Sequence, residues 1–261
     1  MEPQILLESI IEISKNAGNS ILDIYNDNKK NNKIIIKSDN SPLTLADKKS
    51  NDVICKALSK LSIKIPILSE EGSKIDYNKR KEWNKFWLID PLDGTKEFIK
   101  KNGEFTVNIA LIENGIPILG VVHAPVLNTT WYGAMGKGSF KIIQNENPKK
   151  INVIEKNHSS ETIKIVSSRS HANNPKLDNY TSQFNNFELI KMGSSIKICL
   201  VADGSAHYYP RFGPTMEWDT AAAHAVVKYA GGNIFQIESN IELEYNKSNL
   251  LNPGFLVQKS D

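Results

Sequence analysis

Cysteine is scarce in this chain of 261 residues: only Cys55 and Cys199 occur, far apart and without the spacing of metal ligands. Both lie in apolar patterns typical of buried helices, so we expect inert core thiols in a reducing cytoplasm. Long hydrophobic runs are also lacking, and none approaches the ~18 residues that span a bilayer. The opening Met-Glu-Pro-Gln has neither a basic region nor a small-residue cleavage site, which predicts no secretory signal.

An excess of one charge is absent as well. The 32 basic and 29 acidic residues leave a formal charge of +3, too small to indicate nucleic-acid or membrane binding. The basic cluster at residues 29–33 contains no aromatic side chain, which argues against a nucleic-acid-binding module. Hydrophobic residues make up 40% and charged residues 23%, as in ordinary globular proteins. The length allows one large domain or two smaller ones.

Hydrophobic periodicity predicts a mixed α/β protein. Apolar residues at steps of three and four predict helices over 3–25, 45–61, 196–202 and 220–229. Short apolar runs predict strands at 34–36, 63–68, 86–89, 105–112, 116–124, 129–132, 163–167 and 187–191. Polar residues 145–150 mark a predicted boundary between an N-terminal α+β domain, 1–148, and a C-terminal α/β domain, 149–261. This order predicts sheets layered between helices.

Acidic residues gather at three separate places. Glu70-Glu71 follows one predicted strand, Asp90-Pro-Leu-Asp93 follows another, and Asp219 stands at the start of a predicted helix. Such loops commonly carry catalytic groups. Anions packed together in a cleft repel one another, so their convergence requires a cation. Carboxylates suit hard divalent cations, and magnesium above all when phosphate shares the coordination.

The segment from Asp90 to Thr95 is the most informative. Pro91 imposes an extended or turn geometry and leaves Asp90 and Asp93 free to point towards one centre. Gly94 lets the backbone approach a ligand closely. If a helix begins after it, the N–H groups of Gly94 and Thr95 would point at an anion.

Each acidic piece also has a plainer interpretation. Asp-Pro and Asp-Gly are ordinary turn formers. Glu70-Glu71 can be a solvated loop pair, and Asp47 and Asp219 can be acids in the first turn of a helix. Taken together, the pieces are harder to explain in that way.

The motifs resemble those of the inositol monophosphatase superfamily of lithium-sensitive, magnesium-dependent phosphatases. The matching residues are Glu70-Glu71, Asp90-Pro-Leu-Asp93-Gly-Thr95 and Trp218-Asp-Thr-Ala-Ala222. Supporting stretches extend over nearly the whole chain, at 39–47, 96–110, 168–171, 193–197, 209–215 and 251–255. Within that superfamily they are most similar to bacterial 3′(2′),5′-bisphosphate nucleotidases. The resemblance implies an α/β sandwich of αβαβα layers, the sugar-phosphatase fold with two sheets between helix layers.

The resemblance also implies a site for two or three Mg²⁺ ions. Its implied ligands are the carboxylate side chains of Glu70, Asp90, Asp93 and Asp219 and the main-chain carbonyl of Leu92. The implied catalytic residues are Asp47, Thr95 and Glu70, where Thr95 and Asp47 activate the attacking water. The reaction would be an in-line displacement by metal-activated water without a phosphoenzyme.

The implied substrate is 3′-phosphoadenosine 5′-phosphate, whose 3′-phosphate would be released to give AMP, a step of nucleotide recycling in sulfate assimilation. Contacts to the adenosine and its 5′-phosphate fall on His171, Ser194, Lys197 and Arg211. Lys and Arg suit a second phosphate dianion. The other implied substrate contacts coincide with the metal and catalytic residues: Glu70, Leu92, Asp93, Gly94, Thr95 and Asp219.

Two alternative functions stay open. One is an inositol monophosphatase or related sugar phosphatase; the other is a non-catalytic nucleotide sensor, which would lack a metal ligand or the Thr95–Asp47 pair. Glu217 departs from the family pattern, and it either alters the second metal site beside Asp219 or faces solvent. We expect a cytoplasmic monomer, with a dimer and peripheral association with the inner membrane face left open.

Overall fold

Helices and strands alternate along the computed structural model, which describes residues 3–27, 34–36, 42–62, 64–154, 162–169 and 174–260. The helices are α1 (Pro3–Tyr25), α2 (Leu45–Leu58), α3 (Tyr77–Arg80), α4 (Thr95–Ile99), α5 (Pro175–Thr181), α6 (Ile196–Ala202) and α7 (Glu217–Lys228). The strands are β1 (Ile34–Ile36), β2 (Pro42–Thr44), β3 (Ile67–Ser69), β4 (Lys85–Asp93), β5 (Thr106–Glu113), β6 (Ile116–Ala124), β7 (Thr129–Ala134), β8 (Gly138–Ile143), β9 (Lys149–Ile151), β10 (Ile163–Ser168), β11 (Phe187–Met192), β12 (Tyr209–Arg211), β13 (Gly232–Gln236) and β14 (Phe255–Lys259).

A seven-stranded sheet in the order β3-β4-β5-β6-β7-β8-β9 forms the centre of the fold. Its neighbouring strands are antiparallel, except for the parallel pair β3 and β4. Both faces of β4 are buried because Phe86 and Leu88 enter one hydrophobic core while Trp87 and Ile89 enter the other. A strand buried on both faces reads as a continuous apolar run, as the sequence does here.

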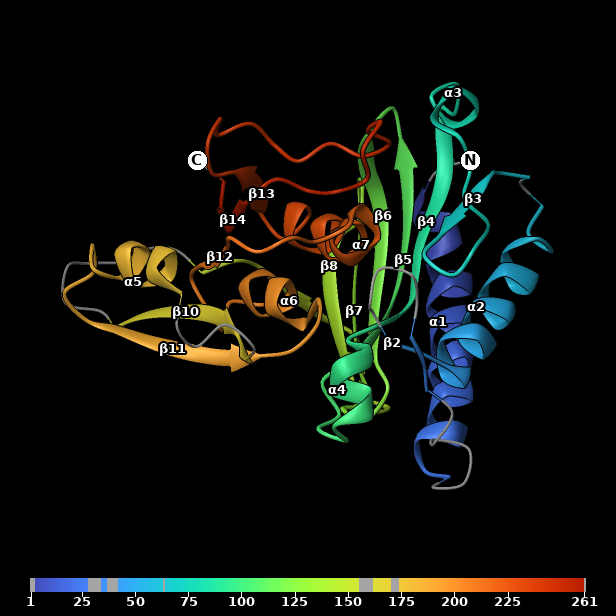
Figure 1. The fold of residues 1–261 in the computed structure, drawn as a ribbon, viewed down its shortest axis with the longest axis horizontal. Helices are drawn as coiled ribbons and strands as arrows, with labels where there is room; N and C mark the ends of the chain where they lie inside the picture. The colour runs from blue at the N-terminus through green and yellow to red at the C-terminus, as the bar shows by residue number, and fades with distance from the viewer. Residues whose placement is uncertain are drawn as a thin grey trace.

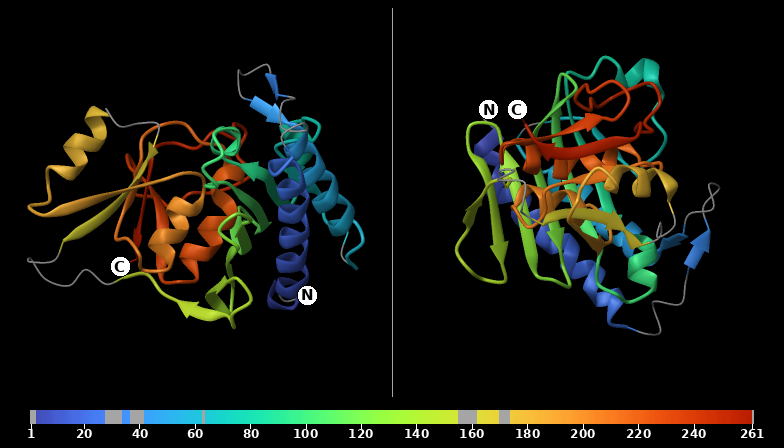
Figure 2. Two further views of the ribbon diagram at one scale, coloured as in Figure 1. Left: turned by 90° about the horizontal axis from the view of Figure 1, so that it is seen from below. Right: turned by 90° about the vertical axis from the view of Figure 1, so that its left-hand side faces the viewer.

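Helices cover both faces of this sheet (Figures 1 and 2). The apolar stripe of α1, including Ile10, Ala17 and Ile21, packs with α2 on one face. On the other face α7 approaches the sheet closely, because Gly120 and its cross-strand partner Gly133 present no side chain to it. A Cβ atom at Gly120 would lie 2.1 Å from the carbonyl oxygen of Ala222.

A second β layer lies beyond α6 and α7 (Figure 1). It consists of the antiparallel sheet β12-β14-β13 and the parallel pair β10-β11. An isolated bridge between Ile165 and Tyr208 connects the two. Helix α5 packs beyond this layer, with the rings of Tyr180 and Tyr208 6.4 Å apart. The predicted layered α/β class is therefore confirmed.

Several predicted boundaries agree with the structure, namely the helices over 3–25 and 196–202 and the strands over 34–36 and 116–124. Others differ at their ends. The helix predicted to reach residue 61 ends at Leu58, and the one predicted from Thr220 begins at Glu217. Strand β4 continues through Pro91 to Asp93, because the ladder with β5 resumes after an irregularity between Asp90 and Asp93.

The predicted division at residue 148 stays a prediction. Strand β9, which follows it, pairs with β8 in the large sheet, and α7 packs on that sheet as well. Among the described residues, no helix combines the length and apolar surface needed to cross a membrane. The basic cluster at 29–33 lies outside the described residues.

The close approach of α7 to the sheet predicts that Gly120→Ala is destabilising. The added methyl group overlaps backbone atoms of a helix, so we expect the free energy of unfolding to fall by about 1–3 kcal/mol. Urea denaturation measures this change. Gly254→Ala is the control, since its nearest neighbour would be 3.3 Å away. Equal effects of the two substitutions would contradict the packing argument.

Candidate active site

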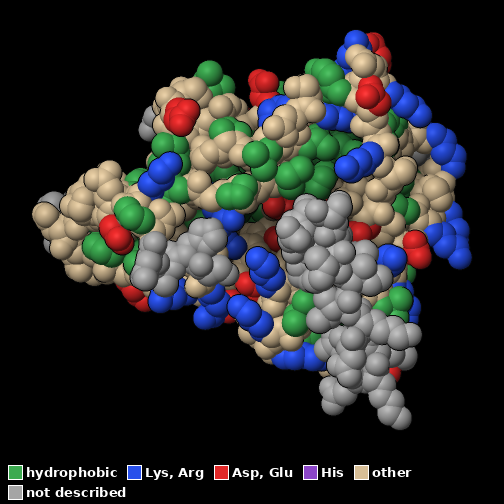
Figure 3. Space-filling model, in the orientation of Figure 1, with side chains coloured by type: hydrophobic (Ala, Val, Ile, Leu, Met, Phe, Trp, Pro, Cys, Tyr) green, Lys and Arg blue, Asp and Glu red, His purple; other side chains and the backbone are tan. Residues whose placement is uncertain are grey.

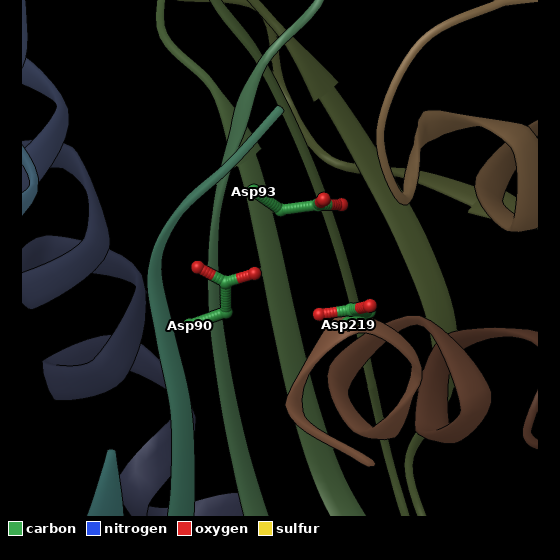
Figure 4. A group of neighbouring side chains, drawn as sticks. All are labelled: Asp90, Asp93 and Asp219. Atoms are coloured by element: carbon green, nitrogen blue, oxygen red, sulfur yellow. The ribbon is translucent and has the colours of Figure 1, made fainter. Parts of the chain in front are cut away.

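Three aspartates converge between β4 and α7. Asp90 and Asp93 lie at the irregular end of β4, and Asp219 lies in the first turn of α7, where it accepts the N–H of Met216 at 2.9 Å. One carboxylate oxygen from each lies within 4.8 Å of the others. Figure 4 shows the three carboxylates around one common space. Leu92 belongs to the same turn, and its N–H donates to Asp90 Oδ1 at 3.0 Å.

Glu70 joins this group from the neighbouring strand. It directly follows β3, the parallel partner of β4, and its N–H donates to the carbonyl of Ile89 at 3.2 Å. Burial raises the pKa of Asp90 well above its usual value, and the negative charges of Glu70, Asp93 and Asp219 raise it further. We refer to Glu70, Asp90, Asp93 and Asp219 as the acidic cluster.

The acidic cluster fits a hard divalent cation. Burial raises the pKa of Asp219 well above its usual value, and the charge of Asp93 adds to the rise. Burial also raises the pKa of Asp93, although Lys197 and the N–H of Ser195 act against it. Carboxylates that favour protonation in this way are stabilised in their charged form by a metal ion. The aspartates offer only oxygen ligands, as Mg²⁺ and similar ions prefer.

Helix α2 supports the site from one side. Ser50, which is fully buried, donates to the carbonyl of Pro91 in the aspartate turn at 2.7 Å. Asn51 accepts the hydroxyl of Ser69, the residue before Glu70, at 2.7 Å. The helix therefore holds two of the loops that carry the acidic cluster.

Thr95 and Asp47 form the predicted pair. The Thr95 hydroxyl donates to Asp47 Oδ1 at 3.2 Å. Asp47 Oδ2 in turn accepts the N–H and hydroxyl of Thr44, at 2.7 and 2.6 Å, in the capping box of α2. Burial raises the pKa of Asp47, and the bonds from Thr44 oppose that rise. Gly94 precedes Thr95 with a φ of 95°, a conformation that favours glycine, and begins the short helix α4.

A pocket of about 200 Å³ opens beside the acidic cluster. Figure 3 shows acidic side chains in a hollow near the centre of this face, with Lys and Arg side chains close by. Six predicted site residues line this pocket: Asp93, Gly94, Ser194, Lys197, Arg211 and Asp219. Of the other predicted site residues, His171 lies outside the described residues.

The pocket also contains residues to which the sequence pattern gave no role. They come from the family-like stretches and include Lys96, Glu97, Ser168, Ser195, Tyr209, Thr215 and Phe255. The stretches themselves were the only available signal, because the order of residues does not indicate which side chains face a cavity.

Three basic residues line the pocket, Lys96, Lys197 and Arg211, and we call the last two the basic pair. Lys197 is 7% exposed, and its ammonium donates to the carbonyl of Ser194. Burial lowers the pKa of Lys197 to about 8, with Asp93 opposing this shift and Arg211 adding to it. The Arg211 guanidinium donates to the carbonyls of Gly213 and Pro214, at 3.2 and 3.1 Å. Such a pair can bind an anionic group next to the acidic cluster.

Glu217 does not face solvent, so that alternative is wrong. It is fully buried and forms an ion pair with Lys247 at 2.7 Å. It also accepts the N–H groups of Asn246 and Lys247, at 2.7 and 2.9 Å. These bonds tie the chain around residue 247 to the start of α7, two residues before Asp219, and they balance the charge of Glu217.

Residues 2–259 match the inositol monophosphatase family. The match covers nearly the whole chain, so the chain belongs to this family of metal-dependent phosphatases. The family membership predicted from the acidic motifs is confirmed.

Two relatives share a name. The 3′(2′),5′-bisphosphate nucleotidase CysQ of Shigella flexneri is 44% identical over 259 residues, covering 97% of this chain and 99% of that protein. The protein of the same name from Buchnera aphidicola subsp. Acyrthosiphon pisum is 46% identical over 253 residues, covering 96% and 92%.

Solved structures agree with the fold. CysQ from Bacteroides thetaiotaomicron, described as a bacterial member of the inositol monophosphatase family, has a TM-score of 0.85 and 41% identity, covering 98% of this chain and 97% of that chain. The extragenic suppressor protein SuhB from Bartonella henselae, at 22% identity, covers 98% of this chain and 94% of its own, with a TM-score of 0.79. At that identity the likeness concerns the fold alone.

The raised pKa values of Asp90, Asp93 and Asp219 predict how Mg²⁺ and pH act together on stability. Because the folded, metal-free protein holds protons that the unfolded chain releases, its stability falls as pH rises through the folded pKa values. A bound divalent cation would replace those protons, so added Mg²⁺ should raise the melting temperature more at about pH 8 than at about pH 5. Thermal unfolding with and without Mg²⁺ tests this, with Asp93→Asn expected to weaken the effect. An equal shift at both pH values would refute it.

Proposed function

We propose that this protein is a 3′(2′),5′-bisphosphate nucleotidase that hydrolyses 3′-phosphoadenosine 5′-phosphate to AMP and phosphate. The observation that carries this proposal is that Lys197 and Arg211 line the same pocket as Asp93 and Asp219. A substrate with two phosphates can place one at the acidic cluster and the other near the basic pair. The two CysQ relatives, at 44% and 46% identity over nearly the full chain, support the same substrate class.

Mg²⁺ is the proposed metal, in two or three sites. The oxygen ligands would come from the acidic cluster and the main-chain carbonyl of Leu92, which lies in the aspartate turn. Bound Mg²⁺ would supply charge neutralisation of the phosphoryl oxygens and a lower pKa for the attacking water.

Thr95 and Asp47 are the proposed general-base pair. Because the Thr95 hydroxyl donates its hydrogen to Asp47, its oxygen can accept a proton from water while its own hydrogen passes to the Asp47 carboxylate. Two hydrogen bonds from Thr44 at the start of α2 hold the Asp47 carboxylate in place. They therefore fix the position of the group that accepts the Thr95 hydrogen. Removing such a base typically costs about 10²- to 10⁴-fold in rate.

Phosphate contacts beyond the acidic cluster are assigned to the pocket wall. Ser194, Lys197 and Arg211 would bind the 5′-phosphate and the adenosine. His171 keeps the same proposed role, although it lies outside the described residues. Gly94 would allow the phosphoryl group to approach the start of α4.

Two other functions are less well supported. An inositol monophosphatase would share the acidic cluster but would leave the basic pair without a second phosphate to bind. A non-catalytic nucleotide sensor would not need the Thr95–Asp47 hydrogen bond next to a complete acidic cluster. We further propose a cytoplasmic monomer; a dimer and peripheral association with the inner membrane face are the alternatives.

A phosphate-release panel tests the proposed substrate. We expect 3′-phosphoadenosine 5′-phosphate to be hydrolysed with the highest kcat/KM and inositol 1-phosphate much more slowly, and only with Mg²⁺ present. Asp93→Asn, purified in parallel, controls for contaminating phosphatases because it should nearly abolish turnover. A clear preference for inositol 1-phosphate would support the sugar-phosphatase alternative, and nucleotide binding without phosphate release would support the sensor.

The role of Lys197 predicts a change in KM rather than kcat. Lys197→Ala removes a charged contact to the second phosphate, so KM for 3′-phosphoadenosine 5′-phosphate should rise about tenfold or more. Slow hydrolysis of a simple phosphate monoester should change little. Lys85→Ala is the control, since its ion pair with Glu113 lies at the start of β4, outside the pocket. An equal loss on both kinds of substrate would refute this role.

A further inference from the structure

Alternate residues leading into and beginning β5 carry a buried row of polar side chains. Glu104, Thr106 and Asn108 are 8%, 0% and 1% exposed, and we call them the polar stripe. The intervening Phe105 and Val107 enter the hydrophobic core with α1 and α2. Residues two apart on a strand share a face, so the stripe points away from that core. Buried polar groups are costly unless they are hydrogen-bonded. The Glu104 carboxylate, the Thr106 hydroxyl and the Asn108 amide oxygen have partners, whereas Asn108 Nδ2 has none among the described residues.

The partners are three consecutive residues, 193–195, between β11 and α6. Glu104 Oε2 accepts the N–H of Gly193 at 2.8 Å. The Thr106 hydroxyl contacts the hydroxyls of Ser194 and Ser195, at 2.7 and 2.8 Å. Asn108 Oδ1 accepts a hydrogen bond from the Ser195 hydroxyl at 2.8 Å. Each residue of the polar stripe therefore forms a hydrogen bond to the 193–195 segment.

The hydroxyl bonds have a defined direction. Since the Ser195 hydroxyl gives its only hydrogen to Asn108, it can only accept from Thr106. Thr106 has then used its own hydrogen and must accept one from Ser194. Thr106 is thus the central member of the chain and the one whose loss breaks two bonds at once.

The 193–195 segment connects the metal site with the pocket. The N–H of Ser195 donates to Asp93 Oδ2 at 2.5 Å. Ser194 lines the pocket, and its carbonyl accepts the Lys197 ammonium. Ser194 also has a φ of 54°, a left-handed conformation that non-glycine residues adopt only when their surroundings enforce it.

Glu104 extends the support to the second β layer. The guanidinium of Arg169, next to the end of β10, pairs with both oxygens of its carboxylate. At Gly193 the fit is tight, since a Cβ atom there would lie 2.7 Å from Cγ of Glu97 and 2.8 Å from the Glu104 carbonyl oxygen. The stripe therefore joins the large sheet, the 193–195 segment and β10.

We propose that the polar stripe positions the 193–195 segment so that Ser195 orients Asp93 and Ser194 shapes the substrate pocket. Glu104, Thr106 and Asn108 are on this view positioning residues, which touch neither metal nor substrate. The substrate part of this inference rests on the proposed function, whereas the metal part does not.

Thr106→Val tests the proposal because it keeps the shape of the side chain and removes only the hydroxyl. Thr130→Val is the matched control: Thr130 is 1% exposed on β7 of the same sheet, and its hydroxyl bonds Nδ1 of His123 at 2.9 Å. We expect Thr106→Val to weaken Mn²⁺ binding, measured by calorimetric titration without substrate, and to raise KM, each by about tenfold. Thr130→Val should leave both within about twofold while lowering the melting temperature to a similar extent.

Thr106→Ser, which retains the hydroxyl, should recover most of the lost Mn²⁺ affinity. Equal effects of the two valine substitutions on Mn²⁺ affinity and KM would overturn the proposal. If Thr106→Val does not fold, Glu104→Gln replaces it, since it keeps an acceptor for Gly193 and loses the charge that binds Arg169. Glu104→Gln should raise KM and leave Mn²⁺ affinity unchanged. An unchanged KM would contradict the proposed positioning role of the polar stripe.

The test separates the two proposals. The Mn²⁺ titration uses no substrate, so its result holds whatever the enzyme hydrolyses. Should the unaltered protein prefer inositol 1-phosphate, the proposed function fails, and the KM comparison of the Thr106 variants is then made on that ester.

Discussion

Mutual repulsion among closely spaced carboxylates is the constraint on which this structure depends. Glu70 follows β3, Asp90 and Asp93 end β4, and Asp219 begins α7. Burial raises the pKa of all three aspartates, and the charges of neighbouring carboxylates raise it further for Asp90 and Asp219. A chain gains nothing in stability by collecting such groups, so the arrangement makes sense only with a bound cation. The surrounding elements oppose the repulsion: α2 holds the loops on one side, and the Glu217–Lys247 ion pair holds the start of α7 on the other.

The pocket beside the acidic cluster opens between the end of β4 and the helices and strands packed beyond it. The large sheet contributes Asp93, and Gly94 follows it at the start of α4. Lys197 comes from α6, Ser194 lies just before that helix, and Arg211 comes from β12. Contacts across this junction must be accurate, because a small displacement of the wall changes the distance between the acidic cluster and the basic pair. The polar stripe of β5 supplies that accuracy with buried hydrogen bonds to residues 193–195.

Sequence patterns predicted the local elements and the acidic motifs well, and long-range pairings poorly. The apolar stripe of α1 and the apolar run from Phe86 to Ile89 are buried, so hydrophobic periodicity alone was enough to predict these elements. Asp47 and Thr95 were paired only through the family resemblance, and the structure contains their hydrogen bond. The partners of Glu104 and Glu217 lie about 90 and 30 residues away, so no local pattern could reveal them. The predicted strand over 105–112 gave no sign of these partners for the same reason.

Anomalous diffraction from crystals grown with Mn²⁺ and AMP measures the position of the metal most directly. We predict at least one strong anomalous peak within coordinating distance, about 2.0–2.5 Å, of oxygens from Asp90, Asp93 and Asp219, with Glu70 as a further ligand. Peaks elsewhere on the surface, together with these carboxylates bound only to protein or water, would contradict a catalytic metal at the acidic cluster.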